Sequence, residues 1–218
     1  QRRWTRGSGQ TARKLLGHVW RTPGVLFRAR VEATFQLLLN VAYPLLLLLV
    51  LATVPLVALG SPLLTLQWLL FGLATLSVTL FYVVSQRHRG WSGCVEGLGL
   101  TPVLFAYGIG LSLSNGLAYL QGLLGGETDF VRTPKRGAIG AIARRYTLRP
   151  ELPFALAELA LAAYAFSGLG YGLWLGHPAA APFLALIGLG FLAVGGRTLL
   201  PATPRGTPSL PGKLALEP

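Results

Sequence analysis

Charged residues are scarce in this sequence, and acidic residues are the scarcest. Only 12% of its 218 residues are charged and 52% are hydrophobic, whereas about 25% of an average soluble domain is charged. The single cysteine, Cys94, excludes an internal disulfide, and the three histidines are too dispersed to indicate a metal site. There is no methionine, even at position 1, which predicts a chain cropped or processed from a longer reading frame. The composition favours an integral membrane protein over a disordered chain or a soluble globule.

The hydrophobic residues are concentrated in long runs. A helix needs about 20 apolar residues to cross a bilayer. Four runs reach that length, at residues 35–59, 62–84, 152–175 and 179–200. The turns within each pair are very short, at residues 60–61 and 176–178. These connections predict two transmembrane hairpins and an all-α membrane fold.

A fifth apolar run, at residues 98–124, is interrupted by proline, serine, asparagine and glycine. If it spans, the 19 lysines and arginines divide into 10 on one side of the membrane and 9 on the other. If it lies in the interface or re-enters, all 19 fall on one side, because the two short turns contain none. Since lysine and arginine concentrate in cytoplasmic segments, we predict about four spans, both termini in the cytoplasm and an interfacial or re-entrant fifth helix. A fifth span is the alternative.

The N-terminal segment has the pattern of an amphipathic helix. Its apolar positions follow the spacing i, i+3, i+4, i+7 and i+8, at Ala12, Leu15, Leu16, Val19 and Trp20. The opposite face is basic, with Arg13, Lys14, His18 and Arg21. Such a helix is typical of the membrane surface. Packing against a soluble domain outside this chain is an alternative, and the two are compatible because the helix has two faces.

Small residues recur in the last two apolar runs. They are Gly168 and Gly172 in the third run with Gly176 directly after it, and Gly188, Gly190, Gly195 and Gly196 in the fourth. We interpret these strips as helix-packing surfaces rather than the lining of a passage. Glu158 lies inside the third run, only a turn or two from its basic end, and we expect it to reach toward Arg149.

Two short motifs stand out from the apolar background. The first is Arg3-Trp4 near the start, and the second runs from Phe130 to Lys135 with the sequence FVRTPK. Together, and in this order, they resemble membrane-embedded family 2 glycosyltransferases of the cellulose-synthase-like and mannan-synthase-like group. That family has a Q-x-x-R-W motif, then membrane helices, then a loop with F-x-V-T-P-K. Here the leading glutamine would precede Gln1. Arg132 replaces the valine of cellulose synthases, which favours a relative over cellulose synthase itself.

The chemistry of these side chains suits sugar and diphosphate binding. Indole rings stack on the C–H faces of sugars, and a guanidinium binds phosphate oxygens in bidentate fashion. The resemblance implies that Trp4 stacks on the acceptor sugar and that Arg3 faces the nucleotide diphosphate. It implies that the second motif is a gating loop closing over the donor. In that loop Thr133 and Lys135 would lie near the diphosphate and Phe130 would anchor the loop, and Pro134 counts with them among the substrate-binding residues.

No catalytic residue or metal ligand is expected within this chain. The resemblance places the catalytic base and the carboxylates for a divalent Mg or Mn ion in an upstream domain. We therefore reject Glu127 and Asp129 as a metal-binding pair. The donor expected for the parent enzyme is a UDP- or GDP-sugar, and the acceptor is a glycan or a lipid. Membrane lipids are expected partners, whereas nucleic acid is not, because the basic residues flank apolar runs.

These observations divide the chain into six parts. They are an acceptor-motif segment with interfacial helices (1–34), a hairpin (35–84), a basic loop with an interfacial or re-entrant helix (85–124), a gating-type loop (125–150), a second hairpin (151–200) and a cytoplasmic tail (201–218). The predicted function is the C-terminal membrane part of an inverting glycosyltransferase, in a bacterial inner membrane, that makes or exports a β-linked glycan. Alone it is expected to be inactive. The alternative is a non-enzymatic membrane scaffold or a small transporter subunit.

Overall fold

A computed structural model describes residues 1–125 and 152–200 of the chain. All regular elements in these two ranges are helices, either α-helices or short 3-10 helices labelled η. In chain order they are α1 (Arg2–Arg21), α2 (Phe27–Leu38), η1 (Leu39–Val41), α3 (Ala42–Ala58), α4 (Leu63–Ser85), η2 (Arg87–Arg89), α5 (Gly90–Gly110), α6 (Ser112–Leu124), α7 (Leu152–Trp174), η3 (Pro178–Ala180) and α8 (Ala181–Leu199).

Five stretches of the described residues are long and apolar enough to cross a membrane. They are Phe27–Ala58, Leu63–Ser85, Arg87–Gly110, Leu152–Trp174 and Pro178–Leu199. This finding supports a multi-pass α-helical membrane protein, as the sequence predicts. How many of the five actually cross stays a prediction.

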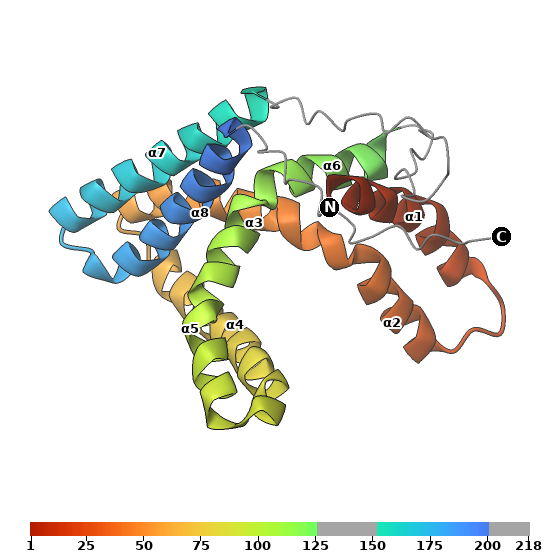
Figure 1. The fold of residues 1–218 in the computed structure, drawn as a ribbon. Helices are drawn as coiled ribbons and strands as arrows, with labels where there is room; N and C mark the ends of the chain where they lie inside the picture. Colours follow the sequence, from red (N-terminus) through yellow and green to blue (C-terminus); the bar gives the residue numbers. More distant parts are fainter. Residues whose placement is uncertain (126–151, 201–218) are drawn as a thin grey trace, which may run out of the picture.

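The fifth apolar run is divided between two helices in the structure. Residues 98–124 belong to two helices, α5 and α6, which meet at an angle at Leu111 (Figure 1). The break follows Gly110, whose hydrogen in place of a side chain lets α5 press against the backbone of Gly190 in α8. Beyond the break, α6 turns away to lie beside α1. Pro102 lies inside α5 without ending it.

The helices α7 and α8 form a closely packed antiparallel pair. Gly188 of α8 packs on the ring of Phe166, and Gly195 packs on Ala155 and Leu159 of α7. The other face of α7 meets α3, where Gly168 contacts Val54. A core of buried side chains fills the space between these helices, with Val50, Ile109, Ala162, Ala165, Phe183, Ile187 and Phe191 as its members.

Two of the predicted packing glycines have other positions. Gly176 lies in the α7–α8 turn with φ of 77°, a conformation that favours glycine. Gly196 has open space where a side chain would be. The remaining five, at positions 168, 172, 188, 190 and 195, have neighbours within contact distance, so packing is their observed role.

The first predicted hairpin is joined by the expected short turn but is open. Near the turn, α3 and α4 touch through the hydrogen bond between Thr53 and Gln67 and through the apolar cluster that contains Val57 and Leu64. Farther along, α4 packs mainly on α5, and the two project together from the bundle (Figure 1). Sequence adjacency therefore does not make α3 the main partner of α4.

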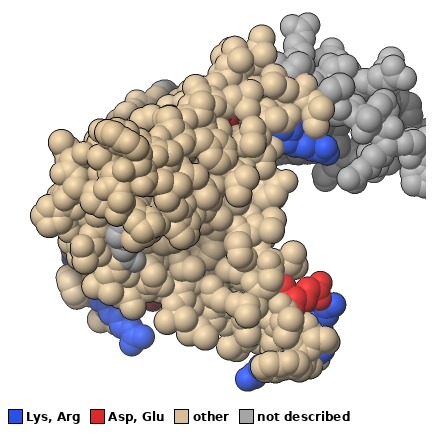
Figure 2. Space-filling model, turned by 90° about the vertical axis from the view of Figure 1, so that its left-hand side faces the viewer, with Lys and Arg blue, Asp and Glu red and all other residues tan. Residues whose placement is uncertain are grey.

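The surface is dominated by uncharged residues. On the face drawn in Figure 2, most of the surface is uncharged, and the prominent charged side chains lie near its margins. Many leucines are exposed on α4, including Leu66, Leu69, Leu70 and Leu73, each at least 52% exposed. Exposed leucine on this scale is expected of helices that face lipid and is unusual on a soluble protein.

Candidate functional site

The predicted Arg3-Trp4 motif lies in the first turn of α1. This helix begins ten residues before the amphipathic pattern suggested, at Arg2. Trp4 is 78% exposed, so its indole faces are accessible. Arg3 is also exposed, and it makes polar contacts of its own. The two residues thus stand on a rigid helix and not on a loop.

The position of α1 is set by close contact with α6. The buried face of α1 consists of the small residues Thr5, Gly9 and Ala12, one helical turn apart. Gly9 meets the backbone of α6, and Gly122 of α6 meets the backbone of Arg6 in return. Side chains at either glycine would force the two backbones apart. The pair lies side by side in Figure 1.

This packing changes the role of the predicted apolar stripe. Ala12 is fully buried, but Leu15 and Trp20 are 45% and 42% exposed. The buried face of α1 is therefore rotated toward its small residues, and Leu15 stays available to lipid or to another domain. Trp20 also contacts α2, where its indole N–H donates to the Thr34 hydroxyl at 2.9 Å and its ring lies edge-on to Phe27.

The helix α1 contacts both described ends of the segment that carries the second motif. The guanidinium of Arg13 donates a hydrogen bond to the carbonyl of Gly125, the last described residue after α6. The guanidinium of Arg2 lies 4.2 Å from the ring centroid of Phe154, in the first turn of α7. Phe130, Thr133, Pro134 and Lys135 themselves lie outside the described residues, as do Glu127, Asp129 and Arg149.

A row of buried polar side chains follows one face of α6. Ser112, Asn115 and Tyr119 are spaced i, i+3 and i+7, and each is at most 1% exposed. Their side-chain polar atoms have no hydrogen-bond partner among the described residues. Burial raises the pKa of the Tyr119 phenol above its ordinary value by removing water from around the charged form. The spacing of this row is present in the sequence. From the sequence alone, however, we interpret the polar residues of the run only as evidence against a membrane span.

Other polar groups join α1 to the start of the apolar bundle. The Asn40 amide in η1 donates to the Ser8 hydroxyl of α1 at 2.9 Å. Arg30 of α2 donates to the Thr22 carbonyl at 2.9 Å. These bonds fix α1 relative to the chain that enters α3. The first predicted motif is therefore held by α2, η1 and α6 together.

Glu158 occupies a buried position between α7 and α8. Its side chain is 2% exposed and packs against Gly195. Within the described residues no three His, Cys, Asp or Glu side chains come together as a possible metal site.

No protein-family model, curated protein or solved structure matches this chain.

Proposed function

We propose that this chain is the C-terminal membrane part of an inverting, nucleotide-sugar-dependent glycosyltransferase that makes or exports a β-linked glycan. The observation that carries the proposal is the position of α1. This helix bears Arg3 and Trp4, and it contacts Gly125 and Phe154 at the two ends of the segment that bears the second motif. The two motifs are distant in sequence, and these contacts bring the described flanks of the segment that bears the second motif to the helix that bears the first.

The proposed division of labour follows from side-chain chemistry. Trp4 offers an exposed aromatic face on which an acceptor sugar stacks. Arg3 and Lys135 supply positive charge for the diphosphate of the donor. In the reaction a base takes the proton of the acceptor hydroxyl, the oxygen forms a bond to the anomeric carbon, and the bond from that carbon to the diphosphate breaks. The nucleoside diphosphate leaves with the electron pair, and the configuration inverts.

The base lies outside this chain in the proposal, as does any site for the metal ion. This chain would bind and orient the acceptor and cover the donor, while another domain of the parent protein supplies the chemistry. Alone, it is not expected to transfer sugar.

The test uses the complete parent protein in membranes, with radiolabelled nucleotide-sugar. Trp4→Ala is expected to reduce transfer to acceptor by about tenfold or more while donor binding stays, because only the stacking platform is lost. Trp91→Ala is the matched control, since Trp91 is 83% exposed on α5, outside the α1 contacts. Lys135→Ala is expected to weaken nucleotide binding by about tenfold to a hundredfold, with Lys213→Ala as its control.

Transfer that is unchanged in both variants would overturn the proposal in favour of a non-enzymatic scaffold or transporter subunit. Loss of transfer in Trp91→Ala to the same extent as in Trp4→Ala would show a general effect of removing surface tryptophan, and would also count against the acceptor platform. Trp4→Ala and Trp91→Ala should insert normally, because neither tryptophan packs in the apolar core of the described residues.

A further inference from the structure

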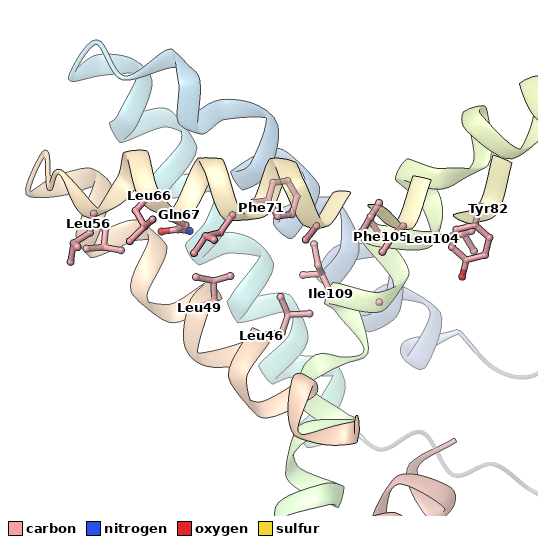
Figure 3. Close-up of a pocket in the computed structure, with 15 residues that line it drawn as sticks. Leu46, Leu49, Leu56, Leu66, Gln67, Phe71, Tyr82, Leu104, Phe105 and Ile109 are labelled. Atoms are coloured by element: carbon pink, nitrogen blue, oxygen red, sulfur yellow. The ribbon is translucent and has the colours of Figure 1, made fainter. Parts of the chain in front are cut away.

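The open first hairpin leaves a long apolar cleft between α3, α4 and α5. Its volume is about 610 Å³. Leucine and phenylalanine form most of its wall, among them Leu46 and Leu49 from α3, Phe71 from α4, and Phe105 from α5 (Figure 3). The cleft exists because bulky side chains, and not glycines, face one another where α3 and α4 diverge.

The shape of the cleft indicates what it can hold. Leu63 and Tyr82 are the first and last α4 residues in its wall, and at 1.5 Å per residue they are ~29 Å apart along the helix. The apolar wall and this length suit an extended alkyl chain.

The two ends of the cleft differ in polarity. Toward the α3–α4 turn, Gln67 is only 8% exposed, and its amide donates to the Thr53 hydroxyl at 2.9 Å. Thr53 in turn donates to the Leu49 carbonyl at 2.7 Å. At the opposite end, Tyr82 is followed within two turns by three basic side chains in η2, namely Arg87, His88 and Arg89, all exposed.

The tip of the α4–α5 pair has the composition of a membrane interface. Phe81 and Trp91 are 69% and 83% exposed on either side of η2, and aromatic residues with arginine concentrate at headgroup level. Arg89 forms an ion pair with Glu96 at 2.9 Å. Arg87 is exposed at the same tip and carries positive charge toward the headgroup region.

We propose that this cleft binds one acyl chain of an anionic phospholipid of the membrane, with the lipid phosphate beside Arg87. The apolar wall accounts for the chain, and the basic tip at the Tyr82 end accounts for the phosphate. The bound lipid fills the space between α3 and the projecting α4–α5 pair.

The first test fills the cleft with protein. Gly108 lines it, and a Cβ at this position has no neighbour within 4 Å, so Gly108→Trp places a ring in the cleft without a backbone clash. Gly99→Trp is the matched control, since Gly99 is on the same helix, has equally open space and does not line the cleft. The full chain is purified in detergent, and dioleoyl phosphatidylglycerol and dioleoyl phosphatidylcholine are titrated with detection by native mass spectrometry.

We expect one phosphatidylglycerol molecule per chain, bound about tenfold more weakly by Gly108→Trp than by the unchanged protein and by Gly99→Trp, since the ring displaces several buried methylene groups. Equal binding by the two variants would overturn the site. A dimer that Gly108→Trp disrupts, without a change in lipid binding, would overturn it in favour of a second copy.

The second test concerns the phosphate and does not depend on filling the cleft. Arg87→Gln is expected to reduce the preference for phosphatidylglycerol over phosphatidylcholine by about fivefold, the effect of one arginine near an anionic headgroup. Arg28→Gln removes an exposed arginine from α2 instead and should leave the preference unchanged. Equal affinity of the unchanged protein for the two lipids, or equal effects of the two substitutions, would overturn the assignment of the phosphate to Arg87.

Discussion

The two hairpins are joined by similarly short turns but pack very differently. The α7–α8 pair is closed, with Gly188 and Gly195 against the facing helix. The α3–α4 pair touches near its turn and leaves the cleft along α4 from Leu63 to Tyr82. Lipid tails are as apolar as leucine, so apolar surface alone does not draw two membrane helices together. Small residues let backbones approach, whereas leucines keep them apart.

The open hairpin is joined near its turn by a polar contact. Thr53 and Gln67 are both buried, and their hydrogen bond is the polar link between α3 and α4. The closed hairpin is held by close packing of small residues instead, with buried alanines and glycines along α7 and α8. A short turn thus determines which helices are neighbours in sequence, while residue size determines how far their contact extends.

The largest expected effect concerns the sides of the membrane on which the turns lie. A Cβ on Gly60 would be 3.7 Å from the His177 ring, so the two hairpin turns lie at the same end of the bundle. We expect Ser61→Cys and His177→Cys, in a Cys94→Ser background, to react with an impermeant maleimide from outside the cell. Arg136→Cys should react only after permeabilisation. Labelling of the two turns from opposite sides would contradict four spans and support a fifth.

A smaller effect is expected from enlarging a residue in the closed hairpin. Gly195→Leu should lower the free energy of unfolding by about 3 kcal/mol, because its Cβ would lie 3.1 Å from Leu159 and 3.2 Å from the Ala155 carbonyl oxygen. The neighbouring Gly196→Leu, and Gly72→Leu on α4, have open space and should change it by less than about 0.5 kcal/mol. Unfolding by denaturant in micelles measures all three. Equal stability of Gly195→Leu and Gly196→Leu would contradict the close packing.

The smallest effect is expected at the polar link of the open hairpin. Thr53→Val should cost about 1 kcal/mol, since it leaves the buried Gln67 amide without its partner. Adding Gln67→Leu should recover most of that loss, because both polar groups are then gone. The same denaturant measurement, as a double-mutant cycle, tests this coupling. Additive losses in the double variant would show that Thr53 and Gln67 contribute independently.

Several parts of the fold could be predicted from the sequence because they depend on local properties. The apolar runs at residues 62–84, 152–175 and 179–200 are helical in the structure, with ends close to those predicted, whereas the run at 35–59 is divided among the end of α2, η1 and α3. The turns fall at the glycines that the chain supplies, and Gly60 and Gly176 have the positive φ angles that such turns need. The number of spans, the orientation and the sugar-binding roles stay predictions.

The sequence predicted the residues of the candidate site but not the contacts that position them. Arg3 and Trp4 were found from their motif, but not their position on a helix that begins at Arg2. Neither the contact of Arg13 with Gly125 nor that of Arg2 with Phe154 has a local signal, because each joins residues more than a hundred positions apart. The burial of Ser112, Asn115 and Tyr119 likewise depends on which helices cover α6.

By itself, the sequence determined a helical membrane class, the positions of the apolar helices and their short turns, since length, hydropathy and glycine act within a few residues. Only the tertiary structure decided that α7 and α8 close, that α3 and α4 open into a cleft, and that α6 bends away from α5 to hold α1. These outcomes depend on the sizes of side chains that meet from distant segments. The size of Gly9 affects helix packing only because the fold brings it against Gly122, and the same holds for a leucine that meets a phenylalanine.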